Sequence, residues 1–405
     1  MSQITAMILA GGRGKRMGVL CDSKPKPALP FAGKFKVIDF GLSNCLNSDI
    51  QDIGVLTGYQ RSYLGNYVKR WHAINAPGKN ITVLKPKNGS YLGTADAVYQ
   101  NLNFLSKQGA ATILVLAADH IYKMEYRKMI AFHQAVKADV TVGVISVPIE
   151  QACQFGNVQR DAESKIIDFK EKPVKPLSSL VSMGIYIFNH SALSRCLIED
   201  AEQPDSVHDF GHVILPKLIK RDRVFAYRFD GYWQDIGTPE AYYKANLDLM
   251  SEYPAFSLDD KWPVFTLENK TIPAKMSHNS QIRNSKIGSG CVIKGRVINS
   301  VLSSGVWVGE NACIKNSVIM ANTSIGRHSV IMNSILDEGV NIGAQCQVGD
   351  ELGKESLHSG LTVLGKNVKV PSYSHVKLNG DIIHAHKSLP EYYEGWVGEN
   401  QPAAI

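Results

Sequence analysis

The chain has 405 residues, which is more than one hydrophobic core ordinarily serves, so its length predicts two domains. Apolar residues make up 44% of the sequence and charged residues 20%, which excludes a disordered or fibrous protein. The net charge of +7 is modest for this length and does not by itself indicate a nucleic-acid partner. Residues 6–10, the longest early apolar run, are too few for a signal peptide or a membrane span. Seven cysteines without a C-x-x-C pair indicate reduced thiols, so we expect a cytoplasmic protein.

Residues 4–10 form an apolar strand that runs directly into a glycine-rich, cationic stretch, GGRGKRMG, at residues 11–18. Its glycine spacing fits neither the P-loop nor the dinucleotide-binding fingerprint. Residues 1–40 carry seven Lys or Arg residues against two Asp residues, with few aromatic residues among them. We therefore expect a small polyanionic ligand at this turn rather than nucleic acid; the alternative is a solvated basic face.

Strands and helices alternate as far as about residue 250. Apolar runs at 53–57, 81–85, 112–119 and 140–147 predict strands, and three-and-four spacing of apolar residues at 94–107 and 124–137 predicts helices. This α/β pattern predicts a doubly wound, mostly parallel mixed sheet covered on both faces. Ligands bind such sheets at the carboxyl ends of strands, so residues 11–16 and Asp119 should share one edge.

Three further side chains suggest phosphoryl or nucleotidyl transfer. Such chemistry needs cations around phosphates and carboxylates that hold a divalent metal, and Asp119 and Asp235 are candidates for the latter. Lys172 lies in FKEKP, where the following proline predicts an extended backbone, and its charge suits a phosphate monoester. Each residue has a plainer alternative, a helix cap for an aspartate and ordinary surface exposure for the lysine.

A second pattern follows residues 251–275, a proline-containing segment that reads as a linker. The motifs NSVL, NSVI and NSIL begin at residues 299, 316 and 333, and aliphatic residues recur every six positions within each repeat. Three short edges per turn predict a parallel β-helix over residues 276–387 rather than a β-sandwich. Residues 388–405 read as a C-terminal tail. The pair His384 and His386 is interpreted as a surface pair rather than a metal site.

The motifs ILAGGRGKRM, KPKPALPFAGKFKVIDFGLSNC, YLGTADAV, FKEKP, SMGIYIF, HDFGHVILP and YWQDIGT resemble those of nucleotide-sugar pyrophosphorylases, in the same order along the chain. The forms SNC, SMGIY and HDFG favour the branch that makes ADP-glucose. The resemblance implies a Rossmann-like nucleotidyltransferase domain at 1–250 and a left-handed β-helix after it. It implies transfer from ATP to glucose 1-phosphate with Mg²⁺, in support of glycogen synthesis, by a homotetramer that binds neither nucleic acid nor membrane.

The resemblance also implies roles for individual residues. Those matching the catalytic and metal positions are Arg16, Lys26, Asp119 and Asp235, with the two aspartates as the Mg²⁺ ligands. Those matching the ATP site are Leu9, Ala10, Gly11, Gly12, Gly14, Arg16, Lys26, Gly93, Thr94 and Asp96. Those matching the glucose 1-phosphate site are Tyr91, Gly156, Glu171, Lys172, Ser182, Tyr186, Asp209, Phe210 and Trp233.

Ser23, Gly58 and Ser90 depart from the family pattern and put allosteric activation in doubt. Three alternatives remain: the same chemistry with another nucleotide, a non-catalytic regulatory paralogue, and an acyltransferase built on the β-helix. His120 is interpreted as a structural neighbour of Asp119 rather than an acid, because the attacking phosphate is already anionic.

Overall fold

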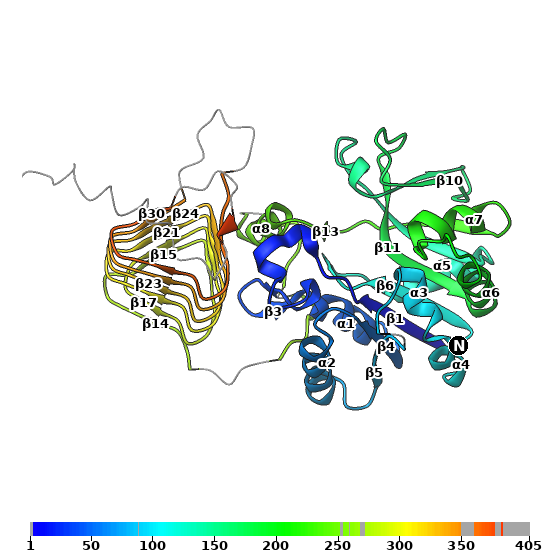
Figure 1. Cartoon of the computed structure of the whole chain (residues 1–405), viewed down its shortest axis with the longest axis horizontal. Coiled ribbons are helices and arrows are strands. Elements are labelled where there is room, and N and C mark those ends of the chain that lie inside the picture. Colours follow the sequence, from blue (N-terminus) through cyan, green and yellow to red (C-terminus); the bar gives the residue numbers. More distant parts are fainter. Residues whose placement is uncertain are drawn as a thin grey trace, which may run out of the picture.

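Two different arrangements of strands divide the chain, a mixed sheet wrapped by helices and a stack of short parallel strands (Figure 1). The computed structural model describes residues 3–87, 89–251, 254–258, 260–267, 272–349, 360–376 and 382–383. Residues 382 and 383 are described by their backbone alone. Within the described part of the chain, no helix combines the length and apolarity needed to cross a bilayer. All seven cysteines are free thiols, and five of them are buried.

The first arrangement is a nine-stranded sheet in which β10 and β11 run against the other strands. Its path is β10-β9-β11-β6-β1-β4-β5, and β8 with its partner β12 joins at β11. The strands are β1 Ile4–Ala10, β4 Asp52–Thr57, β5 Asn80–Leu84, β6 Thr112–Ala117, β8 Val140–Ser146, β9 Gly156–Arg160, β10 Ile166–Glu171, β11 Leu180–Asn189 and β12 Val224–Arg228. The small pairs are β2 Pro30–Phe31 with β3 Phe35–Lys36, and β7 His120–Tyr122 with β13 Trp233–Asp235. The predicted mostly parallel mixed sheet is confirmed.

Helices cover both faces of this sheet, because successive residues of a buried strand point to opposite sides. Ile8 of β1 belongs to a core with α1, α2 and α5, whereas Met7 belongs to a second core with α3, α4, α6 and α7. The helices are α1 Val37–Asn47, α2 Arg61–Asn75, α3 Thr94–Tyr99, α4 Leu102–Lys107, α5 Tyr126–Ala135, α6 His190–Ala201, α7 Leu215–Ile219 and α8 Pro239–Leu247. Short helical turns are η1 Lys15–Cys21, η2 Lys26–Ala28, η3 Ala152–Gln154, η4 Phe210–Ile214 and η5 Asp248–Met250.

The helical pattern predicted over 94–107 is confirmed, and it forms two helices, α3 and α4, rather than one continuous helix. The break lies at Gln100 and Asn101, whose side-chain amides bond locally. Gln100 accepts a hydrogen bond from the backbone N–H of Lys87, and Asn101 donates one to the carbonyl of Ala97. Such side chains compete with helical backbone bonds and favour helix ends.

The second arrangement is a β-helix of three six-stranded parallel sheets. One sheet contains β14 Lys275–Met276, β17 Val292–Ile293, β20 Trp307–Val308, β23 Ser324–Ile325, β26 Asn341–Ile342 and β29 Lys369–Val370. The next contains β15 Gln281–Arg283, β18 Arg296–Ile298, β21 Cys313–Lys315, β24 Val330–Met332, β27 Gln347–Val348 and β30 His375–Val376. The third contains β16 Lys286–Ile287, β19 Val301–Leu302, β22 Val318–Ile319, β25 Ser334–Leu336, β28 Thr362–Leu364 and β31 Ile382–Ile383.

The seventeen-residue repeat corresponds to one coil of this β-helix. Leu302 pairs with Ile319 and Ile319 with Leu336, so equivalent aliphatic residues stack from coil to coil as the sequence predicts. The left-handed twist and the domain limits at residues 250 and 276 stay predictions. The tail at 388–405 and the pair His384 and His386 lie outside the described residues.

The β-helix packs against the N-terminal part of the chain through a shared apolar core. Met17 and Leu20 of η1 lie in one buried cluster with Val301, Val318 and Ile335 of the coils. A buried ion pair adds to this contact: the Lys24 Nζ lies 2.8 Å from Asp337 Oδ1 and 2.9 Å from Glu338 Oε1. The segment following η1 is therefore fixed by the coils before it enters the site described below.

Candidate functional site

Strand topology brings the glycine turn and Asp119 to one edge of the sheet. β1 and β6 are adjacent and parallel, so residues 11–16 and Asp119 leave the sheet at the same end, as predicted. Asp235 arrives from the distant strand β13, which pairs antiparallel with β7 so that Asp235 faces His120. The two aspartates thereby meet although they are far apart in the sequence.

Lys26 lies between these two aspartates. Its Nζ is 2.8 Å from Asp119 Oδ2 and 3.0 Å from Asp235 Oδ1, and its side chain is nearly fully buried. Burial by itself would lower the pKa of Lys26, but attraction to Asp119 and Asp235 outweighs burial and raises it. The ammonium is therefore held charged against both carboxylates.

Asp119, His120 and Asp235 form a set of groups that could hold a metal ion, with ligand atoms within 4.8 Å of one another. Burial by itself raises the pKa of Asp119. The opposing effect of the Lys26 and His120 charges is larger, so the net shift of the pKa is downward. The carboxylate is thus ionised at neutral pH. Two carboxylates this close together suit a hard divalent ion such as Mg²⁺, which prefers oxygen ligands.

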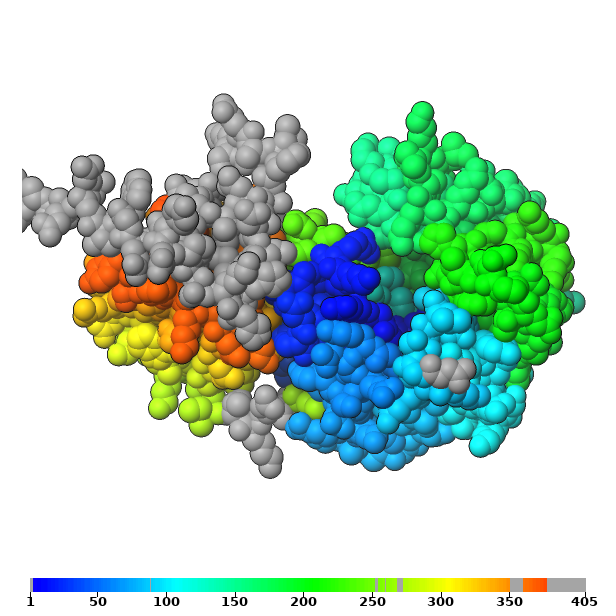
Figure 2. All heavy atoms as spheres, viewed as in Figure 1, coloured from blue at the N-terminus to red at the C-terminus, as the bar shows by residue number. Residues whose placement is uncertain are grey.

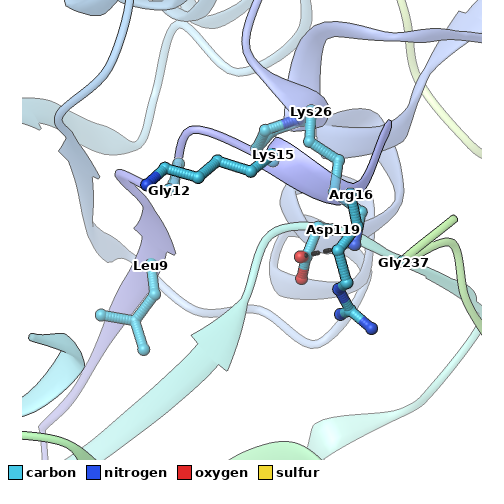
Figure 3. A pocket seen from close by; sticks show the side chains of 10 residues that line it. Leu9, Gly12, Lys15, Arg16, Lys26, Asp119 and Gly237 are labelled. Atoms are coloured by element: carbon cyan, nitrogen blue, oxygen red, sulfur yellow. Dashed lines mark hydrogen bonds and ion pairs between the residues drawn. The ribbon is translucent and has the colours of Figure 1, made fainter. Parts of the chain in front are cut away.

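A cavity of about 290 Å³ opens beside this cluster (Figure 3). The glycine turn and its cations form much of the wall: the lining includes Ala10, Gly12, Gly14, Lys15, Arg16, Lys26 and Asp119. Figure 3 shows the Arg16 and Asp119 side chains on the same side of the cavity. Gly237 leaves room for two functional side chains, because a Cβ at this position would lie 2.9 Å from Arg16 Nη2 and 3.0 Å from Asp235 Oδ2.

A larger cavity of about 870 Å³ shares Leu9, Gly12 and Asp119 with the first. In Figure 2 the surface is hollowed between the N-terminal segments in blue and cyan and the segments in green. Gly11, Tyr91, Gly93, Thr94 and Asp209, all predicted site residues, line this larger cavity, as do Gly58 and Ser90. The two cavities together form one continuous cleft along the strand ends.

Close backbone contacts shape the larger cavity. A Cβ on Gly93 would lie 2.2 Å from the carbonyl oxygen of His208, and one on Gly58 would lie 2.6 Å from that of Gly11. Neither position can therefore carry a side chain without a shift of the backbone. Gly58, a departure from the family pattern, packs directly against the glycine turn.

Asp209 caps the short helix η4. Its Oδ1 accepts hydrogen bonds from the backbone N–H groups of Gly211 and His212, and its Oδ2 accepts one from Thr94 Oγ1 at 2.9 Å. Burial raises the pKa of Asp209, but these hydrogen bonds, led by that from the His212 N–H, give a net lowering. Asp209 and Thr94 thus hold the wall between η4 and α3.

A second group of predicted residues gathers around Glu171, at the end of β10. Positions for a Cβ on Gly156 and on Gly211 lie 2.9 and 2.4 Å from Glu171 Oε2, so both glycines make room for this carboxylate. The rings of Tyr186 and Phe210 lie nearby on β11 and η4, 5.7 Å apart between centroids. Ser182 Oγ donates a hydrogen bond to the Tyr186 hydroxyl at 3.4 Å.

Lys172 departs from its expected backbone conformation. Its φ of 45° is left-handed rather than extended, although proline follows it. A tertiary contact explains the difference: the Lys172 N–H donates a hydrogen bond to the carbonyl of Phe155 at 3.1 Å. Its half-exposed ammonium lies 3.3 Å from Glu171 Oε1.

Comparison with known proteins agrees with this geometry. A family model described as "Nucleotidyl transferase" matches residues 5–252, more than half of the chain. The chain belongs to the nucleotidyl transferase family. A second model, "GMPPB C-terminal domain", matches residues 275–396.

Three similar curated proteins carry the same name. A protein of Desulfitobacterium hafniense (strain Y51), named "Glucose-1-phosphate adenylyltransferase", is 41% identical over 375 residues, 90% of this chain and 94% of that protein. Proteins with the same name from Thermosipho africanus and Thermotoga maritima are 43% and 42% identical over 78% of this chain, and these matches cover 78% and 77% of the relatives.

Trp233 connects the two parts of this nucleotidyl transferase site. Its ring lies 5.1 Å from that of His120 and 5.2 Å from that of Phe155, whose carbonyl binds Lys172. Trp233 Nε1 and His120 Nδ1 are buried without a hydrogen-bond partner among the described residues. Buried polar atoms are rarely left unpaired, so both are available to a polar ligand or water.

Sequence reasoning missed two residues of the nucleotidyl transferase site and placed one differently. Pro27 and Gly237 line the small cavity, and Gly237 could have been suspected because it follows Asp235 in DIG. Asp96 lines neither cavity; its carboxylate accepts hydrogen bonds from the Leu92 N–H and from Gln100. The assigned roles of all these residues stay predictions.

Proposed function

We propose that this nucleotidyl transferase joins ATP and glucose 1-phosphate to form ADP-glucose and diphosphate, supplying glycogen synthesis. The observation that carries the proposal is the convergence of Lys26, Asp119 and Asp235 at a cavity lined by the cationic glycine turn. The relatives named glucose-1-phosphate adenylyltransferase, one of which matches over 90% of this chain, support the choice of substrates.

The reaction needs positioning and charge neutralisation more than a protein nucleophile. A phosphate oxygen of glucose 1-phosphate attacks the α-phosphorus of ATP; that O–P bond forms while the bond to the leaving diphosphate breaks. The attacking oxygen is already anionic, so no general base is required. Asp119 and Asp235 would hold Mg²⁺, which when bound supplies positive charge against the phosphate oxygens.

The chain's own residues supply the rest of the site. Nothing lies within 4 Å of a Cβ position on Gly12, so the backbone of the turn is open to a phosphate. Arg16 and Lys15 bring positive charge to the same cavity. Lys172 offers an ammonium to the sugar phosphate, and the unpaired Trp233 Nε1 offers a donor to a sugar hydroxyl.

A nucleotide panel tests the proposal. Purified protein is given Mg²⁺, glucose 1-phosphate and one of ATP, UTP, dTTP or GTP, and diphosphate release is measured with and without the sugar phosphate. We expect release with ATP that depends on glucose 1-phosphate. Faster release with another nucleotide would reassign the substrate, and no release with any of the four would support a regulatory chain without activity.

The family resemblance also implies a homotetramer, which we include in the proposal. Sedimentation velocity of the purified protein tests this point separately from activity. A single species with four times the chain mass of 44.5 kDa is expected. A monomer that is fully active would refute the tetramer and leave the catalytic proposal intact.

A further inference from the structure

The Lys26 ammonium lies between the two carboxylates that could hold a metal ion. Its Nζ hydrogen-bonds Asp119 Oδ2 at 2.8 Å and Asp235 Oδ1 at 3.0 Å, so it contacts both carboxylates at once. Mg²⁺ binds carboxylate oxygens at about 2.0–2.1 Å and tolerates little distortion of its coordination. The ammonium thus competes with a divalent ion for these two oxygens, and its positive charge repels that ion from the two oxygens that remain.

We propose that Lys26 is the resident counter-ion of the metal site: it neutralises Asp119 and Asp235 until the metal–nucleotide substrate binds, and then transfers its hydrogen bonds to the phosphates. The inference rests on the proposed function for the identity of the incoming ligand. It assigns Lys26 two successive partners, where family resemblance alone implies only the phosphate.

The charges of the site explain why a counter-ion is needed. Asp119 and Asp235 have oxygens within the 4.8 Å cluster, and two carboxylates this close repel each other when partly buried. Leaving buried charge uncompensated is strongly destabilising. Lys26 therefore offsets the repulsion between the two carboxylates before substrate arrives, and a free metal ion has to compete with it.

The surroundings of Lys26 allow its side chain to move while its backbone stays fixed. The backbone lies in η2, where the Leu29 N–H donates to the Lys26 carbonyl, and prolines occupy both neighbouring positions. A Cβ on Gly14 would lie 3.2 Å from Lys26 Cβ, so the glycine turn packs against the base of the side chain. Lys26 also lines the small cavity, so on this proposal a phosphate bound there would take over the ammonium through a change of the side chain alone.

Metal and nucleotide should therefore bind together. A free metal ion gains two carboxylates but forces Lys26 to give up two charge-assisted hydrogen bonds, so its affinity is reduced. When phosphates are present, they accept hydrogen bonds from the displaced ammonium and so replace the two that it gave up. Substituting Lys26 by a neutral residue removes its competition for the carboxylates. Binding of the free metal ion can then be measured apart from the interaction of Lys26 with the phosphates.

The test is the affinity for free Mn²⁺ without nucleotide, measured by electron paramagnetic resonance on the full chain. We expect K26M to bind Mn²⁺ at least about tenfold more tightly than the wild-type protein, because the competing ammonium is gone. K15M is the matched control, since Lys15 lines the same cavity and has no ion pair to either aspartate. The Mn²⁺ affinity of K15M should change by less than about threefold, because this variant loses a positive charge near the site but no hydrogen bond to the aspartates.

Equal or weaker Mn²⁺ binding by K26M than by the wild-type protein would overturn the proposal, as would equal gains in K26M and K15M. If K26M does not fold, K26Q takes its place, because its amide can still donate to one carboxylate. A wild-type structure with Mn²⁺ and a non-hydrolysable ATP analogue provides a test without any variant. Lys26 should then be beyond hydrogen-bonding distance of at least one aspartate, and retention of both contacts contradicts the inference.

These readouts are independent of turnover. If the wild-type protein makes ADP-glucose but K26M gains no Mn²⁺ affinity, the counter-ion role fails and the proposed function stands. If K26M gains Mn²⁺ affinity but no nucleotide supports diphosphate release, the counter-ion role stands and the proposed function fails.

Discussion

Asp119 contributes to the site both as a candidate metal ligand and as a partner of Lys26. Asp119→Asn preserves the shape of the side chain and removes its charge. We expect kcat with ATP and glucose 1-phosphate to fall by about 10² to 10³, the usual cost of one well-placed electrostatic group. Steady-state diphosphate release gives the measurement.

Asp230→Asn is the control for this substitution, because Asp230 forms an exposed ion pair with Arg228 outside both cavities. It should leave kcat within about twofold. Near-normal turnover by Asp119→Asn would count against the assigned role of the carboxylate.

At the scale of residues, the sequence predicts which residues lie at the ends of buried strands, but it does not predict which groups the ends of long side chains contact. The turn at 11–16 and Asp119 could be placed at one edge because parallel strands end together. The ammonium of Lys26 lies between two carboxylates that come from distant segments, and no local pattern encodes that contact. For Lys172 it was the backbone conformation that local sequence did not predict. A hydrogen bond to the Phe155 carbonyl overrides the extended conformation that a residue before proline prefers.

Asparagines at equivalent positions of successive coils form a ladder of side-chain hydrogen bonds that stabilises the β-helix. Asn299 Nδ2 donates to Asn316 Oδ1 at 2.7 Å, and Asn316 Nδ2 donates to Asn333 Oδ1 at 3.4 Å. All three have a positive φ, which asparagine tolerates better than most residues. Asn316→Ala should therefore lower the free energy of unfolding by about 2 kcal/mol, through lost hydrogen bonds and backbone strain.

Urea titration measures this loss, and Asn316→Gly separates its two causes. Glycine accepts the positive φ but cannot join the ladder, so it should recover about half of the loss, or roughly 1 kcal/mol. Wild-type stability in Asn316→Ala would show that the ladder contributes nothing.

The start of α1 should make stability depend on pH. Asp39 is fully buried; it accepts hydrogen bonds from the Lys36 N–H at 2.8 Å and the Tyr67 hydroxyl at 2.7 Å. Burial raises its pKa from 3.8 to about 6, although these hydrogen bonds lower it. The folded state thus holds this proton more tightly than the unfolded state, so the contribution of Asp39 to stability is largest below pH 4 and is lost as pH rises through about 6.

Asp39→Asn should remove this dependence, because the amide does not titrate; its oxygen can accept from the Lys36 N–H while its NH2 group donates to the Tyr67 hydroxyl oxygen. The wild-type free energy of unfolding, compared with that of Asp39→Asn, should fall by up to about 3 kcal/mol between pH 4 and pH 7. Urea titrations of both proteins across that interval give the difference. A difference that does not change with pH would refute the shifted pKa.

Among the elements, the coils of the β-helix follow directly from the sequence, whereas the break between α3 and α4 does not. The register of the coils follows from a repeat that keeps each aliphatic residue above its equivalent, as Val301, Val318 and Ile335 show. The break at Gln100 and Asn101 depends on side-chain hydrogen bonds to a neighbouring loop and to the preceding turn. Apolar spacing does not report such contacts.

At the scale of the whole molecule, Lys24 links the two arrangements of strands. It is 1% exposed, and Asp337 is fully buried. Burial alone would lower the pKa of Lys24, but attraction to Asp337 and Glu338 outweighs burial and raises it. Asp337→Ala leaves Lys24 with Glu338 alone and should lower the free energy of unfolding by about 3 kcal/mol.

The double variant Lys24→Met with Asp337→Leu tests whether the ion pair or the packing matters. Replacing both charges by apolar residues of similar size should restore most of the lost stability, because no charge is then left unpaired. Thermal unfolding of the wild-type protein and the single and double variants gives the comparison. A double variant as unstable as Asp337→Ala would show that the damage comes from lost packing.

Lys24 and Lys26 are separated only by Pro25, yet one side chain ends among the coils and the other between the candidate metal ligands. The C-terminal solenoid is therefore not an interchangeable accessory. A chimaera whose donor coils lack a carboxylate at the position of Asp337 would leave Lys24 without this partner, two residues from Lys26. Grafting should succeed only when donor coils and the recipient's residues 24–26 are exchanged as one unit.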